Sequence, residues 1–134
     1  EVLLLAKGVG ERHKKFSIIL SRIQYGSSRN VPRMIWAVGN ASKEFMLLQK
    51  DLEKAFSAST ILHFIPEKRP YTLHLTLARL NGFELQTMEQ DELPIVDEEI
   101  TWEVPADSFE VMESKLKHGG AKYTTICNIK LNDR

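Results

Sequence analysis

The segment 71–78 constrains the fold most, because its polar and apolar residues alternate strictly in the order Tyr-Thr-Leu-His-Leu-Thr-Leu-Ala. Successive side chains of a β-strand point to opposite faces, so the segment predicts a strand with one apolar and one polar face. Its three leucines are expected to bury the apolar face in a core. The polar face presents the imidazole of His74 and the hydroxyl of Thr76, roughly 6.5–7 Å apart along the strand.

A second segment with a clear period predicts a helix at 43–56. Ser42 precedes it as a candidate N-cap, and Glu44 lies in the first turn, where the helix dipole favours a carboxylate. The helix would bury one stripe of apolar residues spaced three or four apart. The stripe consists of Phe45, Leu48, Leu52 and Phe56.

Weaker patterns predict the other elements of an α+β fold with antiparallel sheets and packed helices. Residues 2–13 are expected to form a short helix, with Leu4, Leu5 and Val9 as its buried positions. The acidic segment 89–99 is expected to be a linker. Strands are predicted at 16–25, 34–38, 100–113 and 122–131.

The composition excludes several classes of protein. A single cysteine, Cys127, leaves no disulfide framework and no cysteine metal cluster within one chain. Lys+Arg and Asp+Glu both number 18, so no long basic stripe for duplex nucleic acid is expected. No stretch approaches the roughly 18 apolar residues of a membrane span. We therefore expect a cytoplasmic protein without membrane association, and the sequence suggests neither a metal site nor a cofactor.

His74 and Thr76 together suit a phosphate group. An imidazole transfers protons near neutral pH, and a hydroxyl can donate a hydrogen bond to a non-bridging phosphate oxygen. The pair alone does not separate this interpretation from a plainer one, because a histidine and a threonine often share the exposed face of a half-buried strand. The residues around the pair favour the functional interpretation.

The segment from Arg69 to Arg79, RPYTLHLTLAR, resembles the second H-x-T-x motif of a family of two-histidine phosphoesterases. This is the RNA 2′,3′-cyclic phosphodiesterase (2′-5′ RNA ligase, or LigT-like) family. The family usually has proline where this chain has Leu73, a position behind the motif. The resemblance extends to other segments and covers nearly the whole chain. These segments are 32–36, 43–56, 108–116 and 119–123.

The resemblance implies metal-independent hydrolysis of RNA ends that carry a 2′,3′-cyclic phosphate, giving a 2′-phosphate. The reverse 2′-5′ joining would be a side activity. His74 would accept a proton, and a second histidine would donate one. Thr76 would hold a phosphate oxygen, and Arg79 matches a family arginine that contacts phosphate. Strand parity places Arg79 on the leucine face, so its role requires a bulge or a strand end near Ala78.

The resemblance also implies a part of the fold that these residues do not contain. The family has two H-x-T-x motifs that face each other across a cleft between two lobes. His74 is the only histidine of this chain in such a motif. Residues 1–134 are therefore expected to be a single partial domain of the two-lobed fold, with a central lobe at 14–82 and strands of the terminal lobe at 100–131. A missing N-terminal segment or a second chain would supply the first motif.

Two other functions stay open from the sequence. One is a module that binds nucleotides or RNA ends without turnover, because a single motif is half of a catalytic pair. The other is an α+β interaction domain in which His74 has no catalytic role.

Overall fold

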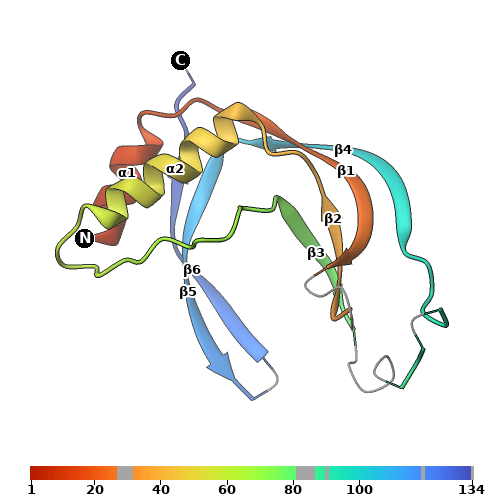
Figure 1. The fold of residues 1–134 in the computed structure, drawn as a ribbon. Helices are drawn as coiled ribbons and strands as arrows, with labels where there is room; N and C mark the ends of the chain where they lie inside the picture. Colours follow the sequence, from red (N-terminus) through yellow and green to blue (C-terminus); the bar gives the residue numbers. More distant parts are fainter. Residues whose placement is uncertain (27–31, 81–86, 90, 119, 134) are drawn as a thin grey trace. The chain divides into compact units, whose positions relative to one another are not determined.

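Ser42 begins the longest helix of the chain. Its side-chain oxygen accepts a hydrogen bond from the backbone N–H of Phe45 at 3.2 Å, which satisfies one of the free donors at the helix start. The sequence prediction of this helix and of its N-cap is confirmed. The computed structural model describes residues 1–26, 32–80, 87–89, 91–118 and 120–133 (Figure 1).

The order of elements along the chain is α-β-β-α-β-β-β-β. The helices are α1 (Val2–Gly10) and α2 (Lys43–Ser57). The strands are β1 (Phe16–Gly26), β2 (Met34–Val38), β3 (His74–Arg79), β4 (Asp97–Ala106), β5 (Ser108–Lys117) and β6 (Gly120–Lys130). The predicted α+β class is confirmed, because the structure combines two helices with sheets in which every strand pair with an established register is antiparallel.

The chain divides into two compact units. The helical unit comprises Glu1–Ser17, Ser42–Arg69 and Pro105–Arg134, and the sheet unit comprises Ile18–Ala41 and Pro70–Val104. The helix α2 therefore groups with α1, whereas the expected central lobe at 14–82 combined it with the strands. The assignment of 14–82 and 100–131 to two lobes of a larger fold stays a prediction.

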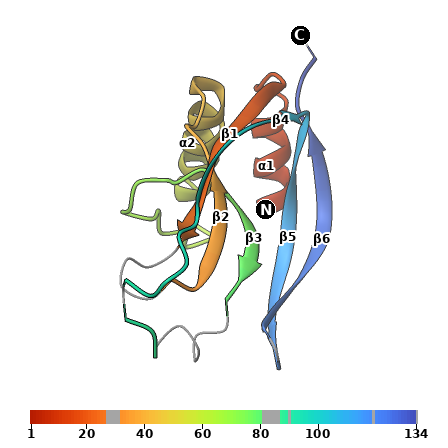
Figure 2. The same ribbon diagram turned by 90° about the vertical axis from the view of Figure 1, so that its right-hand side faces the viewer.

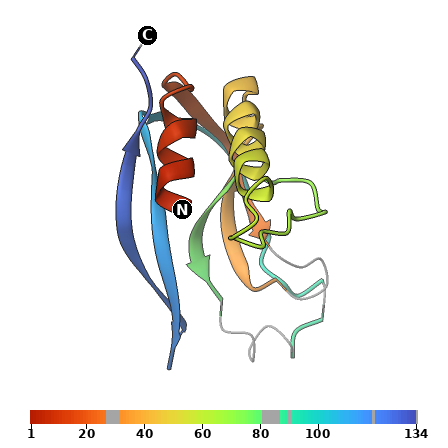
Figure 3. The same ribbon diagram turned by 90° about the vertical axis from the view of Figure 1, so that its left-hand side faces the viewer.

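In the helical unit, α1 lies along the hairpin of β5 and β6 and also contacts α2 (Figure 3). Val9 and Leu48 are buried in its core together with Leu131, and burying a side chain of this size stabilises a fold by about 1.5–3 kcal/mol. Gly10 permits the close approach of α1, because a Cβ there would lie 2.6 Å from the Ile129 side chain. Leu4, expected to be buried, is 72% exposed, and Ala6 is buried in its place.

The predicted stripe on α2 is confirmed by its contacts. Leu48 is buried and Leu52 packs against the same core. Phe45 meets Phe16 edge to face with ring centroids 6.0 Å apart, and Phe56 meets Phe64 in the same way at 5.7 Å. Such pairs add roughly 0.5–1.5 kcal/mol beyond area burial, so the aromatic residues fix both ends of α2.

The sheet unit contains a sheet of order β3-β2-β1-β4, and β1, β2 and β3 lie side by side in Figure 2. Both β1 and β3 run antiparallel to β2. The strand β3 is an edge strand, and its leucine face is not buried as the alternation predicted. Leu75 is 50% exposed and Leu77 is 41% exposed, whereas Leu73, which precedes the strand, is buried.

The region after residue 96 differs from the sequence prediction. A single strand was expected at 100–113, and the structure has two, β4 and β5, separated at Asp107. Pro105 cannot donate to a strand ladder, which is consistent with the end of β4 there. The strand β4 also begins at Asp97, inside the expected acidic linker.

Neither helix, among the residues that the structure describes, is long and apolar enough to cross a membrane.

Candidate active site

The register of β2 and β3 defines the face on which the predicted site residues lie. Val38 is opposite His74, and Trp36 is opposite Thr76. Residues directly opposite each other in a sheet point to the same side, and so do alternate residues of one strand. His74 and Thr76 therefore share one face of the sheet, as predicted, and both residues are exposed.

A β-bulge brings Arg79 to the same face. Trp36 pairs with Thr76, but the next residue of β2, Ile35, pairs with Ala78, so Leu77 is the extra residue of β3. A bulge of this kind reverses the alternation that follows it. Arg79 consequently pairs with Met34 and points to the side of Thr76. The bulge near Ala78 that a role for Arg79 requires is thus present.

The thioether of Met34 lies between the side chains of Thr76 and Arg79. Its sulfur is 4.0 Å from Thr76 Oγ1 and 3.8 Å from Arg79 Nη1. A thioether is a weak hydrogen-bond acceptor, whereas an anionic oxygen binds hydroxyl and guanidinium donors strongly. Thr76 and Arg79 therefore direct their donors toward one small volume, which a weak acceptor occupies.

A backbone contact orients His74. Its Nδ1 lies 2.8 Å from the carbonyl oxygen of Thr72. A carbonyl oxygen can only accept, so this contact is a hydrogen bond when Nδ1 carries the proton. Nε2 of the neutral ring is then unprotonated and able to accept a proton, which is the state that a general base needs.

The indole of Trp36 stacks on the imidazole of His74, with ring centroids 4.1 Å apart and planes at 30°. The sequence did not indicate this contact, because it depends on the register of β2 against β3. Gly26 lies on the other side of Trp36, and a Cβ at Gly26 would be only 2.1 Å from the indole. Trp36 Nε1 is buried without a partner among the described residues, which costs about 1–3 kcal/mol.

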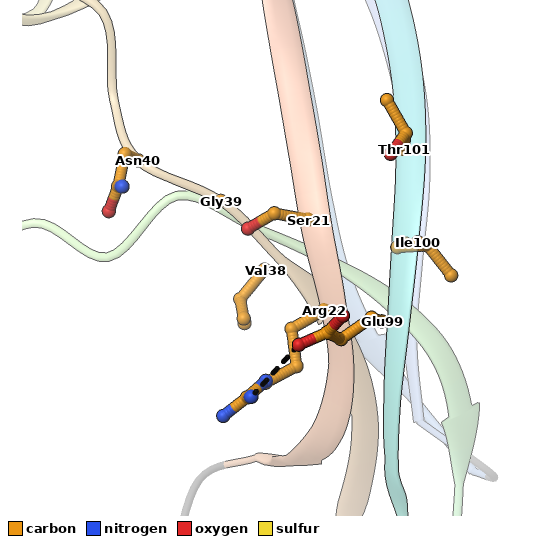
Figure 4. Close-up of a pocket in the computed structure, with 8 residues that line it drawn as sticks. All are labelled: Ser21, Arg22, Val38, Gly39, Asn40, Glu99, Ile100 and Thr101. Carbon is orange, nitrogen blue, oxygen red and sulfur yellow. Dashed lines mark ion pairs between the residues drawn. The ribbon is translucent and has the colours of Figure 1, made fainter.

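The sheet unit also contains a pocket of about 610 Å³ (Figure 4). Arg22 stands in it between two carboxylates, 3.2 Å from Asp97 and 3.9 Å from Glu99. The pocket is next to His74 on the sheet, because Val38 lines the pocket and is opposite both Arg22 and His74. The lining residues are Ser21, Arg22, Val38, Gly39, Asn40, Glu99, Ile100 and Thr101. Sequence reasoning did not identify this pocket, whose residues come from three strands and a loop.

The other histidines lie outside the sheet unit, so His74 is its only one. In the helical unit, His13 Nε2 lies 3.0 Å from Asp51 Oδ2. This hydrogen bond, with a further contribution from Arg12, holds the pKa of the Asp51 carboxyl below its usual value. The contact gives His13 a structural role. Among the residues that the structure describes, no three His, Cys, Asp or Glu side chains gather in a way that could hold a metal ion.

Several solved structures share this fold. The crystal structure of TT0787 of Thermus thermophilus is 22% identical, with a TM-score of 0.75 over 96% of this chain and 67% of that one. The crystal structure of E. coli LigT complexed with 3′-AMP is 19% identical, with a TM-score of 0.66 over 97% of this chain and 66% of that one. A crystal structure described as a phosphoesterase is 19% identical, with a TM-score of 0.67 over 97% of this chain and 66% of that one.

These likenesses confirm the predicted LigT-like fold. The chain spans about two thirds of the length of each of these structures. No protein-family model matches the sequence, and no curated protein matches it.

Proposed function

We propose that this chain contributes His74, as one of two catalytic histidines, to the hydrolysis of RNA 2′,3′-cyclic phosphate ends to 2′-phosphates. The reverse 2′-5′ joining is a side activity of the same site. The observation that carries the proposal is the bulge in β3, which gathers Arg79 with His74 and Thr76 on one face of the sheet. The motif of the two-histidine phosphoesterases and the fold of LigT support the same reaction.

The three side chains have complementary roles in this reaction. His74 Nε2 accepts the proton of the attacking water as the oxygen bonds to phosphorus. The bond from phosphorus to O3′ breaks, and a second histidine protonates O3′ to leave a 2′-phosphate and a 3′-hydroxyl. Thr76 and Arg79 donate to the non-bridging oxygens, where negative charge increases in the transition state.

The second histidine comes from outside the sheet unit, because His74 is the only histidine there. In such a displacement, the base that accepts the proton of water and the acid that protonates O3′ lie on opposite sides of the phosphorus. The proposal therefore requires a second H-x-T-x motif, in a further segment or a partner chain, that faces β3.

The pocket around Arg22 would receive the part of the RNA beyond the reacting phosphate. Arg22 lies in the same row of the sheet as His74, because Arg22, Val38 and His74 are opposite one another on three neighbouring strands. Asn40 and Arg22 offer hydrogen-bond donors, and Glu99 offers an acceptor. Bases use both kinds of partner and phosphates use the donors, so a nucleotide fits this lining better than an apolar ligand.

The second candidate is a module that binds nucleotides or RNA ends without turnover. It is favoured by the single histidine of the sheet unit, and the LigT structure with a similar fold is complexed with 3′-AMP. A phosphate NMR experiment separates the two candidates. The protein as isolated from its source, with any segment or partner that supplies the second motif, is mixed with a nucleoside 2′,3′-cyclic phosphate without added metal, and the ³¹P resonance is followed.

Hydrolysis replaces the signal of the cyclic phosphate with that of a 2′-phosphate. Binding without turnover broadens or shifts the signal of the cyclic phosphate and forms no product. A spectrum unchanged at a large excess of protein would contradict both candidates and favour the interaction domain.

A further inference from the structure

We propose that Trp36 is a positioning residue for His74, holding its imidazole in the orientation in which Nδ1 donates to Thr72 and Nε2 is left for proton transfer. The orientation of the His74 imidazole follows from contacts within the sheet unit. The role of this orientation in proton transfer rests on the proposed function. Trp36 does not belong to the H-x-T-x motif, and no contact with substrate is required of it.

An exposed histidine needs two constraints to keep one ring orientation. Rotation about its last side-chain torsion is broad and roughly two-fold, so the ring plane and the flip state are set separately. The stack against Trp36, at 4.1 Å between centroids, sets the plane. The carbonyl of Thr72, 2.8 Å from Nδ1, sets the flip state. Neither contact is sufficient alone, because a flipped ring would stack equally well and an unstacked ring would turn away from the carbonyl.

Trp36 is itself held in place, which a positioning residue must be. It lies on β2, which has β1 on one side and β3 on the other. Gly26 leaves room for the indole on the β1 side. The buried Nε1 has no partner among the residues that the structure describes. A phenyl ring would make the same stack without an unpaired donor, so Trp36→Phe is a conservative variant.

The spectroscopic test reads the tautomer of His74 by ¹⁵N NMR of the imidazole at a pH where the ring is neutral. In the unsubstituted chain we expect the Nδ1–H form, because only that form donates to Thr72. Trp36→Leu removes the stack, and we expect a mixture in which the Nε2–H form increases. Trp36→Phe keeps the stack and should keep the Nδ1–H form. An unchanged tautomer in a folded Trp36→Leu variant would overturn the proposal.

A second measurement covers the case in which Trp36→Leu does not fold. Trp102→Phe leaves Trp36 as the only tryptophan, and a protonated imidazole in contact with an indole quenches its fluorescence. Emission should fall as the pH is lowered from about 8 to about 5, the range in which histidines titrate. The additional change His74→Gln should abolish this fall. Emission that does not change with pH, or a fall that persists in His74→Gln, would overturn the proposal.

Kinetics then test the role in the proposed reaction. Misorientation of a general base lowers kcat more than it raises KM, so Trp36→Leu should lower kcat by about 10- to 100-fold. Trp36→Phe should retain most of the kcat. If the unsubstituted protein, assayed as isolated from its source, shows no turnover, the proposed function fails, while the two spectroscopic results still decide whether Trp36 holds His74. Unchanged kcat in Trp36→Leu would overturn the positioning role.

Discussion

Thr76 and Arg79 are three residues apart on one strand, yet both side chains meet the sulfur of Met34. An unbroken strand would place them on opposite faces. Leu77 is the extra residue of a bulge, and it restores Arg79 to the face of Thr76. Bulges are common beside functional sites because they re-aim a side chain, and this bulge adds a cation to the histidine and the hydroxyl.

Arg79→Gln should therefore lower kcat/KM for a cyclic phosphate by about 10- to 100-fold, because it removes a charged donor from the developing phosphate charge. The control is Arg69→Gln, since Arg69 is an exposed arginine that pairs with Glu67 in the helical unit. Steady-state kinetics on the two variants make the comparison. An equal fall in kcat/KM in both variants would show that Arg79 acts only through the overall charge of the protein.

Met34→Leu tests whether the sulfur merely fills the position of a phosphate oxygen. The change conserves volume and should cost less than about 1.5 kcal/mol in the free energy of unfolding. We expect kcat/KM to stay the same or to rise, because Thr76 and Arg79 lose a competing acceptor. A large fall in kcat/KM, with thermal unfolding unchanged, would instead give the sulfur a direct role with substrate.

The local features of the fold were predictable, whereas the contacts across strands were not. The alternation around His74 and Thr76 and the N-cap at Ser42 are properties of neighbouring residues, and the structure confirms both. The stack of Trp36 on His74 depends on which residues of β2 and β3 are opposite each other. A strand pattern contains no information on that register, so the role of Trp36 could not be inferred from it.

Other differences have equally physical reasons. The leucines of β3 predicted a buried face, but an edge strand has a neighbour on one side only, and Leu75 and Leu77 stay about half exposed. Apolar residues recur on both sides of Asp107, where the chain passes from the sheet to the β5–β6 hairpin. Periodicity shows which residues are extended and does not show where a strand changes partner.

Gly26→Ala should destabilise the fold and disturb the site, because its Cβ would lie 2.1 Å from the indole of Trp36. Overpacking of this kind typically costs about 1–3 kcal/mol, and urea unfolding measures it. Gly8→Ala is the control, since its Cβ would be 3.8 Å from Arg12 Nη1, and alanine favours the helix by about 1 kcal/mol. Gly26→Ala as stable as the unsubstituted chain would contradict the close packing of Trp36.

Asp51→Asn should lower stability in a pH-dependent way. The hydrogen bond with His13, assisted by Arg12, lowers the pKa of Asp51 in the folded state. A depressed carboxyl pKa stabilises the fold above the unfolded value of about 3.9, and this contribution is lost as the pH falls through the folded value. The side chain is partly exposed, so we expect a loss of about 0.5 kcal/mol at neutral pH that disappears in acid.

Unfolding of Asp51→Asn is best compared with that of Glu53→Gln, on the same helix, for which the described part of the chain shows no ion pair. A loss for Asp51→Asn that is independent of pH would mean that the carboxylate charge does not contribute. An equal loss in Glu53→Gln would mean that the effect belongs to the charge of the helix as a whole.

The most direct test of the central claim is hydrolysis of a short RNA that ends in a 2′,3′-cyclic phosphate, without added metal. It compares the unsubstituted protein with His74→Ala and with His118→Ala, a histidine in the hairpin of the helical unit. Both these 134 residues and the protein as isolated from its source are assayed. We predict a 2′-phosphate product from the unsubstituted protein and from His118→Ala. In His74→Ala we predict a rate lower by about 10²- to 10⁴-fold. Equal rates with and without His74, or no hydrolysis by either form of the protein, would contradict the claim.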